Sequence, residues 1–479
     1  MILLLLILIP FVSGIISFLW KNESVKSWAL GTALLTLVVA VIACPINGQA
    51  LLAYDVPWIS SLGARFSLYG TGMSIMLALL TAIVFPVIFI AQRNKPVADP
   101  HRFYGLMLLT QAGLMGVFLA HDLLLFYFFW ELALIPVYFL CSTWGGERRI
   151  PVTFKFFVYT FLGSLIMLAG IIYLYLQTPN RTFDYEAIKL AAASLNDPQS
   201  PAMLGQNVVF CLFFIAFAIK MPIFPFHTWQ PDTYEQSSTP VTIVLSALMV
   251  KMGLFATVKW LVNIMPEGTA YWTNTIMILS VIGILYASIL AMVQSDIKRL
   301  IAYSSIAHIG LMSMGIFAND PGGIAMNGLM VQMFNHGINI TGMWLIVSMI
   351  EQRYGTRNLR ELGGMAGSAP KMAIALVIIA FANIALPLTN GFIGEFMLFH
   401  GIFQSPNPYH ITFMVLAGLG VILGAVYTLN MVQKVAYGEA KTTAVVNDVS
   451  KNELLGLVII IVLILVLGVY PKILFGIIG

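Results

Sequence analysis

The sequence predicts an all-α protein that crosses a membrane many times. Of its 479 residues, 59% are hydrophobic and only 9% are charged, whereas soluble domains carry roughly 25% charged residues. The apolar segments are long and continuous, as spanning helices of about 20 residues require, and they lack the alternation of a β-barrel. The same composition excludes disordered chains, coiled coils and disulfide-stapled secreted domains.

Fourteen apolar runs are long enough to form membrane helices. The first run has no basic segment before it and no small-residue cleavage motif after it, so we expect a retained helix and not a signal peptide. The fourth and fifth runs are separated only by His121. The fourteen runs cover residues 2–19, 28–45, 69–91, 102–120, 122–142, 152–177, 206–226, 240–263, 272–292, 298–316, 323–350, 371–402, 410–434 and 454–475.

The charges of the loops predict the orientation of these helices. When the loops are assigned alternately to two sides, 17 of the 24 Lys and Arg residues fall on one side and 5 fall on the other, with Lys259 among those 5. Because the more positive loops stay inside, both termini are expected on the outer side. The two remaining cations, Lys220 and Lys251, lie within apolar runs.

Six titratable residues lie near the middle of six different runs, and they are the candidate functional residues. A charge at the centre of a bilayer costs about 2.5–3.5 kcal/mol on insertion scales. One buried Lys–Glu pair can be structural, and a lone membrane histidine can simply bond a neighbouring helix. Six such groups at one depth favour a path for protons or cations. The residues are Glu131, Lys220, Lys251, His308, His336 and Glu395.

Two of these runs also contain helix breakers. Pro222 and Pro225 follow Lys220, and Pro387 precedes Glu395. Proline interrupts the helical hydrogen bonds, and broken helices at matching places in two repeats mark the ion path of many transporters. The broken runs are the seventh and the twelfth, five apart, so a repeated five-helix unit must be inverted. The predicted units are residues 1–101 (helices 1–3), 102–263 (helices 4–8), 264–434 (helices 9–13) and 435–479 (helix 14).

The rest of the composition indicates what the chain does not carry. Cys44, Cys141 and Cys211 all lie in apolar runs and show no metal-ligand spacing, so we expect small buried side chains, no metal and no redox centre. A net charge of +4 is too small to suggest nucleic-acid binding.

Several segments around these residues resemble one known family, the antiporter-like subunits of respiratory complex I, the proton-translocating NADH:quinone oxidoreductase. Three features favour the M-type subunit. Glu395 stands where L-type and N-type chains carry lysine. The pattern GGERR is followed by KFF, and the sequence ends soon after the last apolar run. The loop QPDTYEQSSTPVT is closer to the N-type chain. The segments that carry the resemblance are FYFFWELALIPVYFL, AIKMPIFPFHTWQPD, LMVKMGLFA, DIKRLIAYSSIAHIGLM and LPLTNGFIGEFMLF.

The resemblance implies roles for the six residues. Glu131 and Lys220 would form an ion pair, Lys251 would be the central relay lysine, and His308 and His336 would continue the path to Glu395. The chain itself would hold no cofactor, because FMN, iron–sulfur clusters and quinone belong to other subunits.

The resemblance also implies the partner subunits and the membrane of this chain. L-type and N-type antiporter-like chains would flank this chain, together with lipids, in the inner membrane of a bacterium. The alternatives are a subunit of an Mrp-type cation/proton antiporter and a membrane subunit of a related hydrogenase complex.

Overall fold

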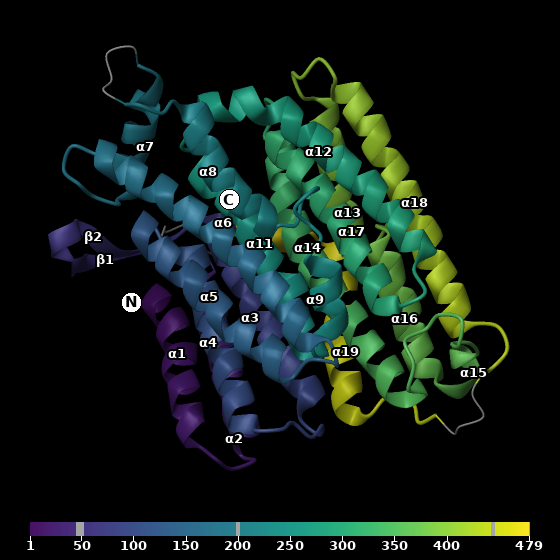
Figure 1. Cartoon of the computed structure of the whole chain (residues 1–479). Helices are drawn as coiled ribbons and strands as arrows, with labels where there is room; N and C mark the ends of the chain where they lie inside the picture. Colours follow the sequence, from purple (N-terminus) through teal and green to yellow (C-terminus); the bar gives the residue numbers. More distant parts are fainter. Residues whose placement is uncertain (45–51, 198–201, 442–445, 479) are drawn as a thin grey trace.

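The computed structural model describes residues 1–44, 52–197, 202–441 and 446–478. Nearly all of its regular structure is helical, apart from one β-hairpin (Figure 1). In chain order, with η1 and η2 as 3₁₀ turns and η3 and η4 as π-helical turns, the elements are α1 (Ile2–Leu19), α2 (Val25–Ala43), β1 (Leu52–Ile59), η1 (Ser60–Leu62), β2 (Ala64–Gly70), α3 (Gly72–Gln92), α4 (Pro100–Leu119), α5 (Leu123–Thr143), α6 (Arg149–Gln177), α7 (Tyr185–Ala193), η2 (Ser194–Asn196), α8 (Gln206–Lys220), α9 (Gln230–Gln236), α10 (Thr239–Ile243), η3 (Val244–Met249), α11 (Val250–Thr257), η4 (Val258–Val262), α12 (Pro266–Val293), α13 (Ile297–Phe317), α14 (Ile324–Tyr354), α15 (Met365–Ser368), α16 (Pro370–Asn383), α17 (Asn390–Phe403), α18 (His410–Ala436), α19 (Lys451–Val469) and α20 (Lys472–Ile478).

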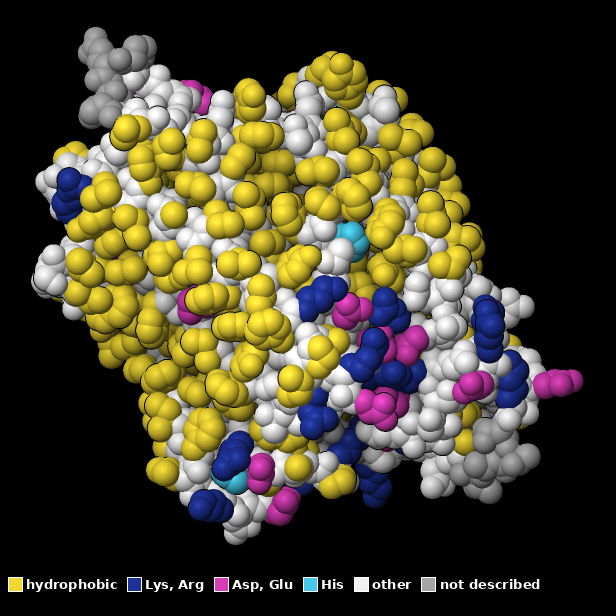
Figure 2. Space-filling view, viewed as in Figure 1, with side chains coloured by type: hydrophobic (Ala, Val, Ile, Leu, Met, Phe, Trp, Pro, Cys, Tyr) yellow, Lys and Arg dark blue, Asp and Glu magenta, His cyan; other side chains and the backbone are white. Residues whose placement is uncertain are grey.

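The helices have the lengths and the surface of a membrane protein, which confirms the predicted class of an all-α protein with many membrane-spanning helices. Eleven helices among the described residues are long and apolar enough to cross a membrane, and α8 and α16 are shorter apolar helices. Apolar side chains cover most of the face in Figure 2, and charged side chains gather toward one end of it. An exposed apolar surface of this extent suits contact with lipid or with other membrane chains.

The two ends of the helix bundle differ in character. The charged end carries Arg148, Glu235, Asp296 and Arg357 around one cavity. The opposite, hairpin end carries β1 and β2, which pair in antiparallel fashion. Helix α3 joins the two ends, because it starts directly after β2 and finishes at Gln92, which lines the cavity of the charged end.

The hairpin was not predicted, because residues 52–70 form neither a long apolar run nor a conspicuous turn motif. Its strand β2 holds the short link between α4 and α5. The backbone N–H of His121 donates to the carbonyl oxygen of Ser67 at 2.8 Å, and Leu68 forms an isolated bridge with Ala120. The sequence predicted that one residue separates these helices. In the structure the connection is the extended segment from Ala120 to Asp122, which is hydrogen-bonded to β2.

Both predicted helix breaks are confirmed. Helix α8 ends at Lys220, and the chain is not helical again until α9 begins at Gln230. Helix α16 ends at Asn383, and α17 begins at Asn390. The prolines of these segments explain the breaks, because each removes a backbone donor and excludes the preceding turn.

The segment from Thr239 to Val262 lies at the centre of the bundle, and all of it up to Leu261 is buried. It contains the two π-helical turns, η3 and η4, on either side of α11. π-helical turns release backbone carbonyls from the regular ladder and occur often at functional sites. Around this segment pack α8, α14 and α4, so the titratable side chains of these helices can meet away from lipid.

Candidate functional site

Lys251 is the centre of the site. It lies on α11 and is fully buried. Its Nζ donates to the carbonyl oxygen of Ser246, in the π-turn η3, at 2.9 Å, and lies 2.7 Å from Nδ1 of His336 on α14. Among the described residues no carboxylate forms an ion pair with it. A buried amine held by a carbonyl and an imidazole can exist with or without its extra proton, as a relay requires.

Two histidines continue the row of titratable side chains that starts at Lys251. His336 is buried on α14, and His308 is half-buried on α13. Their ring centroids are 5.5 Å apart. The Nε2 atom of His336 is buried without a hydrogen-bond partner in the protein. Such an atom is free to exchange a proton with its neighbours, either directly or through ordered water.

Glu395 is at the far end of this line. Its Oε1 lies 3.1 Å from Nδ1 of His308 and accepts a hydrogen bond from Nε2 of Gln332 at 3.3 Å. Glu395 as a whole is 5% exposed. A crevice lined by His308, Glu395, Asn383 and Tyr427 lies between these residues and helices α12 and α18. The relay line, which we define as Lys251, His336, His308 and Glu395, therefore reaches from the centre of the bundle toward this crevice.

Helix α14 also holds the second helix break in place. Nδ2 of Asn335 donates to the carbonyl oxygen of Asn390 at 2.7 Å, and Nδ2 of Asn339 donates to that of Ala382 at 3.1 Å. These carbonyls belong to the end of α16 and the start of α17. The two asparagines therefore tie α14 to both sides of the break that positions Glu395.

The other two predicted residues are not part of the relay line. Lys220 is the last residue of α8, where the helix dipole favours a cation. It is 2% exposed, its Nζ has no hydrogen-bond partner, and it lies 5.2 Å from the ring of Trp130. Gly253 brings α11 against the end of α8, because an added Cβ would lie 2.8 Å from the backbone nitrogen of Met221.

Glu131 and Lys220 do not form the expected ion pair in this structure. Glu131 lies on α5 one residue after Trp130, and it lines a surface groove with Trp58, Tyr127 and Phe128. Its Oε1 is buried without a partner. Because the indole of Trp130 takes the contact with the ammonium, a carboxylate contact would require one of these side chains to move.

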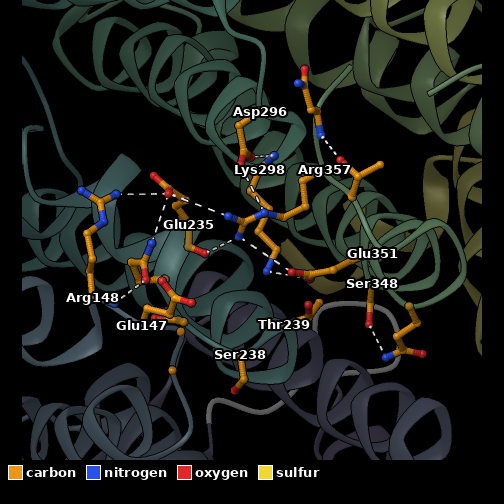
Figure 3. Close-up of a pocket in the computed structure, with 18 of the residues that line it drawn as sticks. Glu147, Arg148, Glu235, Ser238, Thr239, Asp296, Lys298, Ser348, Glu351 and Arg357 are labelled. Carbon is orange, nitrogen blue, oxygen red and sulfur yellow. Dashed lines mark hydrogen bonds and ion pairs between the residues drawn. The ribbon is translucent and has the colours of Figure 1, made fainter. Parts of the chain in front are cut away.

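The cavity of the charged end, about 1020 Å³, opens between the two halves of the chain (Figure 3). Glu235 is at its centre, 2.8 Å from Arg299 and 3.2 Å from Arg148. Lys298 pairs with Glu351 at 2.9 Å, and Arg357 lies 3.8 Å from both Glu235 and Glu351. Burial raises the pKa of Glu235, but the hydrogen bond and charge of Arg299, with the other arginines, outweigh it and hold that pKa below its usual value.

Sequence reasoning missed Gln332, Asn335 and Asn339, although a signal was present. With His336 they recur at spacings of three and four residues, which places them on one face of a helix. A polar stripe inside an apolar run indicates a face turned toward the protein interior.

Comparison with known proteins supports a single family. The family "NADH:quinone oxidoreductase/Mrp antiporter, TM" matches residues 120–431, which include all six predicted residues. NADH-quinone oxidoreductase subunit M of Rhodobacter capsulatus is 34% identical over 472 residues, covering 96% of this chain and 90% of that protein. Subunit M of Escherichia coli strain K12 is 33% identical over 495 residues, covering 98% and 94%.

This chain belongs to the subunit M family of NADH-quinone oxidoreductases. Among solved structures, respiratory complex I from Thermus thermophilus with bound NADH contains a chain with a TM-score of 0.88 and 28% identity, covering 100% of this chain and 97% of that one. A chain of the Mrp complex from Dietzia sp. DQ12-45-1b has a TM-score of 0.87 at 21% identity. The subunit M family thus shares its fold with antiporter complexes.

Proposed function

We propose that this chain is the M-type, proton-translocating membrane subunit of an NADH-quinone oxidoreductase. Membership of the subunit M family over nearly the whole chain supports this function. The chain contributes proton movement to the enzyme, whereas NADH oxidation and quinone reduction take place in other subunits, which hold FMN and the iron–sulfur clusters. L-type and N-type chains flank it in the inner membrane of a bacterium.

The relay line carries the proposal. Its four residues come from four helices. Lys251 Nζ lies 2.7 Å from Nδ1 of His336, the rings of His336 and His308 have centroids 5.5 Å apart, and Nδ1 of His308 lies 3.1 Å from Oε1 of Glu395. A proton on Lys251 passes to Nδ1 of His336, the second imidazole takes it up, and Glu395 receives it. The first and last contacts already have hydrogen-bond length, whereas the two imidazoles must approach each other or be bridged by a water molecule.

Lys220 supplies the proton that enters the relay line, and the position of Glu131 controls when Lys220 releases it. Burial disfavours a charged amine, and a nearby carboxylate favours it. When Glu131 approaches Lys220, the ammonium form is held. When Glu131 withdraws toward its surface groove, Lys220 releases a proton toward Lys251, across the close packing at Gly253. The cavity of the charged end supplies protons from the inner side, and they leave on the outer side.

The repeats predicted from sequence have support in one pair of matching details. Asp122 caps α5 through the N–H groups of Leu124 and Leu125, and its backbone bridges Asp184. At the charged end, Asp296 caps α13 in the same way and bridges Asn358.

The two Asp-capped links lie at opposite ends of the bundle, and the helices that they start are the fifth and tenth predicted runs. This pair of details supports two inverted five-helix repeats within fourteen crossings. It also fits the positive charge of the inner loops, which places both termini outside.

The function is tested by replacing Lys251 with methionine in the intact complex. Methionine keeps most of the length and volume of lysine but cannot carry a proton. We expect proton pumping per NADH oxidised to fall in proteoliposomes while the complex assembles normally. The matched control is Lys189→Met, an exposed lysine of α7, which should pump like the parent. Parental pumping by Lys251→Met would overturn the relay.

A further inference from the structure

A second buried lysine lies at the hairpin end, outside the relay line. Lys259, in the π-turn η4, is only 7% exposed, although its place near the end of a predicted run suggested a loop charge. Its Nζ donates to the carbonyl oxygen of Ala120 at 2.6 Å and lies 5.5 and 5.4 Å from the rings of Phe255 and Trp260. Within the described part of the chain, no carboxylate forms an ion pair with it.

His121, the residue after Ala120, is the titratable neighbour of this lysine. Its ring is stacked between Tyr69 and Tyr185, with centroids 4.8 Å away on both sides. Its Nδ1 is buried and has no partner in the protein. Burial first, and then the charge of Lys259, lower the pKa of His121 to about 4, while the charges of Asp184 and Asp55 act in the opposite sense.

The remaining acid close by, Asp122, is already engaged. Its two oxygens accept hydrogen bonds from the backbone N–H groups of Arg65, Leu124 and Leu125. His121 thus directly follows the residue whose carbonyl oxygen Lys259 binds, and Tyr185, which stacks on His121, donates its hydroxyl to the carbonyl oxygen of Lys259 at 3.4 Å.

The charge of each group disfavours a charge on the other. While Lys259 is an ammonium, its charge adds to burial in disfavouring an imidazolium at His121. Once Lys259 loses its proton, only the cost of burial remains. The pair thus holds one proton at a time and can pass it from the lysine to the histidine.

Lys259 lies on the same helical segment as Lys251. Both lysines belong to the same central helix, eight residues apart, which corresponds to about 12 Å along its axis. Lys259 lies on the side of the hairpin end. Trp260 beside it has a buried Nε1 without a protein partner, a kind of group that usually binds ordered water.

A purely structural role for Lys259 explains less. Its bond to Ala120 covers a free carbonyl at the end of α4, but a neutral donor could do so without burying a charge. An unpaired buried cation is costly, and sites that retain one inside a membrane are commonly functional.

We propose that Lys259 and His121 form a proton-release pair for the first repeat, a second route to the outer side. This inference rests on the proposed proton relay. Lys259 takes a proton delivered from the Lys251 side, and its ammonium gives that proton to Nδ1 of His121. The imidazolium then releases it to water at the hairpin end, which restores both neutral groups.

The test compares Lys259→Arg, Lys259→Met and His121→Phe in the intact complex in proteoliposomes. Arginine keeps the charge and a donor for Ala120 but does not give up its proton, and phenylalanine keeps the stack between the tyrosines. We expect all three to lower protons pumped per NADH, but less than Lys251→Met does, because the relay line to Glu395 stays open. The control Lys189→Arg, at the same end, should pump like the parent.

A structural lysine would give a different pattern, with Lys259→Arg and His121→Phe pumping like the parent and only Lys259→Met impaired. That pattern overturns the release pair. If Lys259→Arg does not assemble, parental pumping by His121→Phe alone overturns it. Loss of pumping in Lys251→Met with parental pumping in the Lys259 variants would remove this route and leave the relay line intact. Parental pumping in all of them would overturn both.

Discussion

Glu395 differs from the other members of the relay line because it is the one acid among bases. It is held by His308 and Gln332 at 3.1 and 3.3 Å and is placed there by a helix that restarts at Asn390. An acid in this position can accept the proton that reaches His308 and lose it again when a neighbouring charge changes. A structural acid would need only its hydrogen bonds.

We expect Glu395→Gln to lower proton pumping per electron and Glu395→Asp to retain part of it. Glutamine keeps the shape and can still bond His308, but it cannot titrate. Aspartate titrates similarly and is about one methylene shorter. Pumping should be compared in membranes with matched subunit content. Near-parental pumping in both variants would leave Glu395 a structural role only.

The charged end offers a prediction about pH. Because the pKa of Glu235 is lowered below 4.5, its ion pairs stabilise the fold fully above that value, and this contribution is lost as pH falls through the lower folded pKa. Glu235→Gln should lower stability by roughly 1–3 kcal/mol at neutral pH. The difference from the parent, measured by thermal unfolding, should shrink below pH 4.5. A difference independent of pH would contradict the assignment.

At the scale of elements, close packing joins α8, which ends at Lys220, to α11, which carries Lys251. An added methyl at Gly253 would lie 2.8 Å from backbone atoms of Met221 and Phe217. Backbone cannot move aside as a side chain can, so the helices must separate.

Gly253→Ala should therefore destabilise the subunit by about 1–3 kcal/mol and lower pumping, since Lys220 and Lys251 move apart. The matched control is Gly418→Ala on α18, where an added Cβ meets nothing within 4 Å. Thermal unfolding in detergent measures the first effect and proteoliposome pumping the second. Equal behaviour of the two variants would show that this contact does not position the lysines.

Helices and helix breaks could be predicted from the sequence where nearby residues determine them. Pro222 and Pro387 mark the helix breaks directly, and length with hydrophobicity marks the long helices. Contacts across the fold were not predictable. Lys251 and His336 are 85 residues apart, so only the packing of α11 on α14 brings them together. Lys259 looked like a loop charge because its burial depends on the Ala120 link and the hairpin, which carry no strong sequence signal.

At the scale of the whole molecule, the two ends of the bundle face opposite sides of the membrane. The inner loops carry most of the cations, so the charged end should be inside and the hairpin end outside. Arg360 is exposed beside the charged end, and Ser61 is exposed at the tip of the hairpin.

This orientation can be measured by cysteine labelling in intact cells. With Cys44, Cys141 and Cys211 replaced by alanine, a membrane-impermeant maleimide should label Ser61→Cys and should not label Arg360→Cys. Both should be labelled after the membrane is permeabilised, which controls for accessibility. The reverse pattern in intact cells would overturn the topology.

The polar stripe of α14 has a mechanical consequence. One face of this helix carries His336 and Gln332 of the proton path together with Asn335 and Asn339, which grip the carbonyls of the broken helix. Turning α14 as a rigid rod would break both asparagine bonds in the act of moving the imidazole. If the proposed proton path operates, α14 is expected to stay fixed while the ring of His336 rotates about its own side-chain bonds, a motion far faster than rearrangement of a helix.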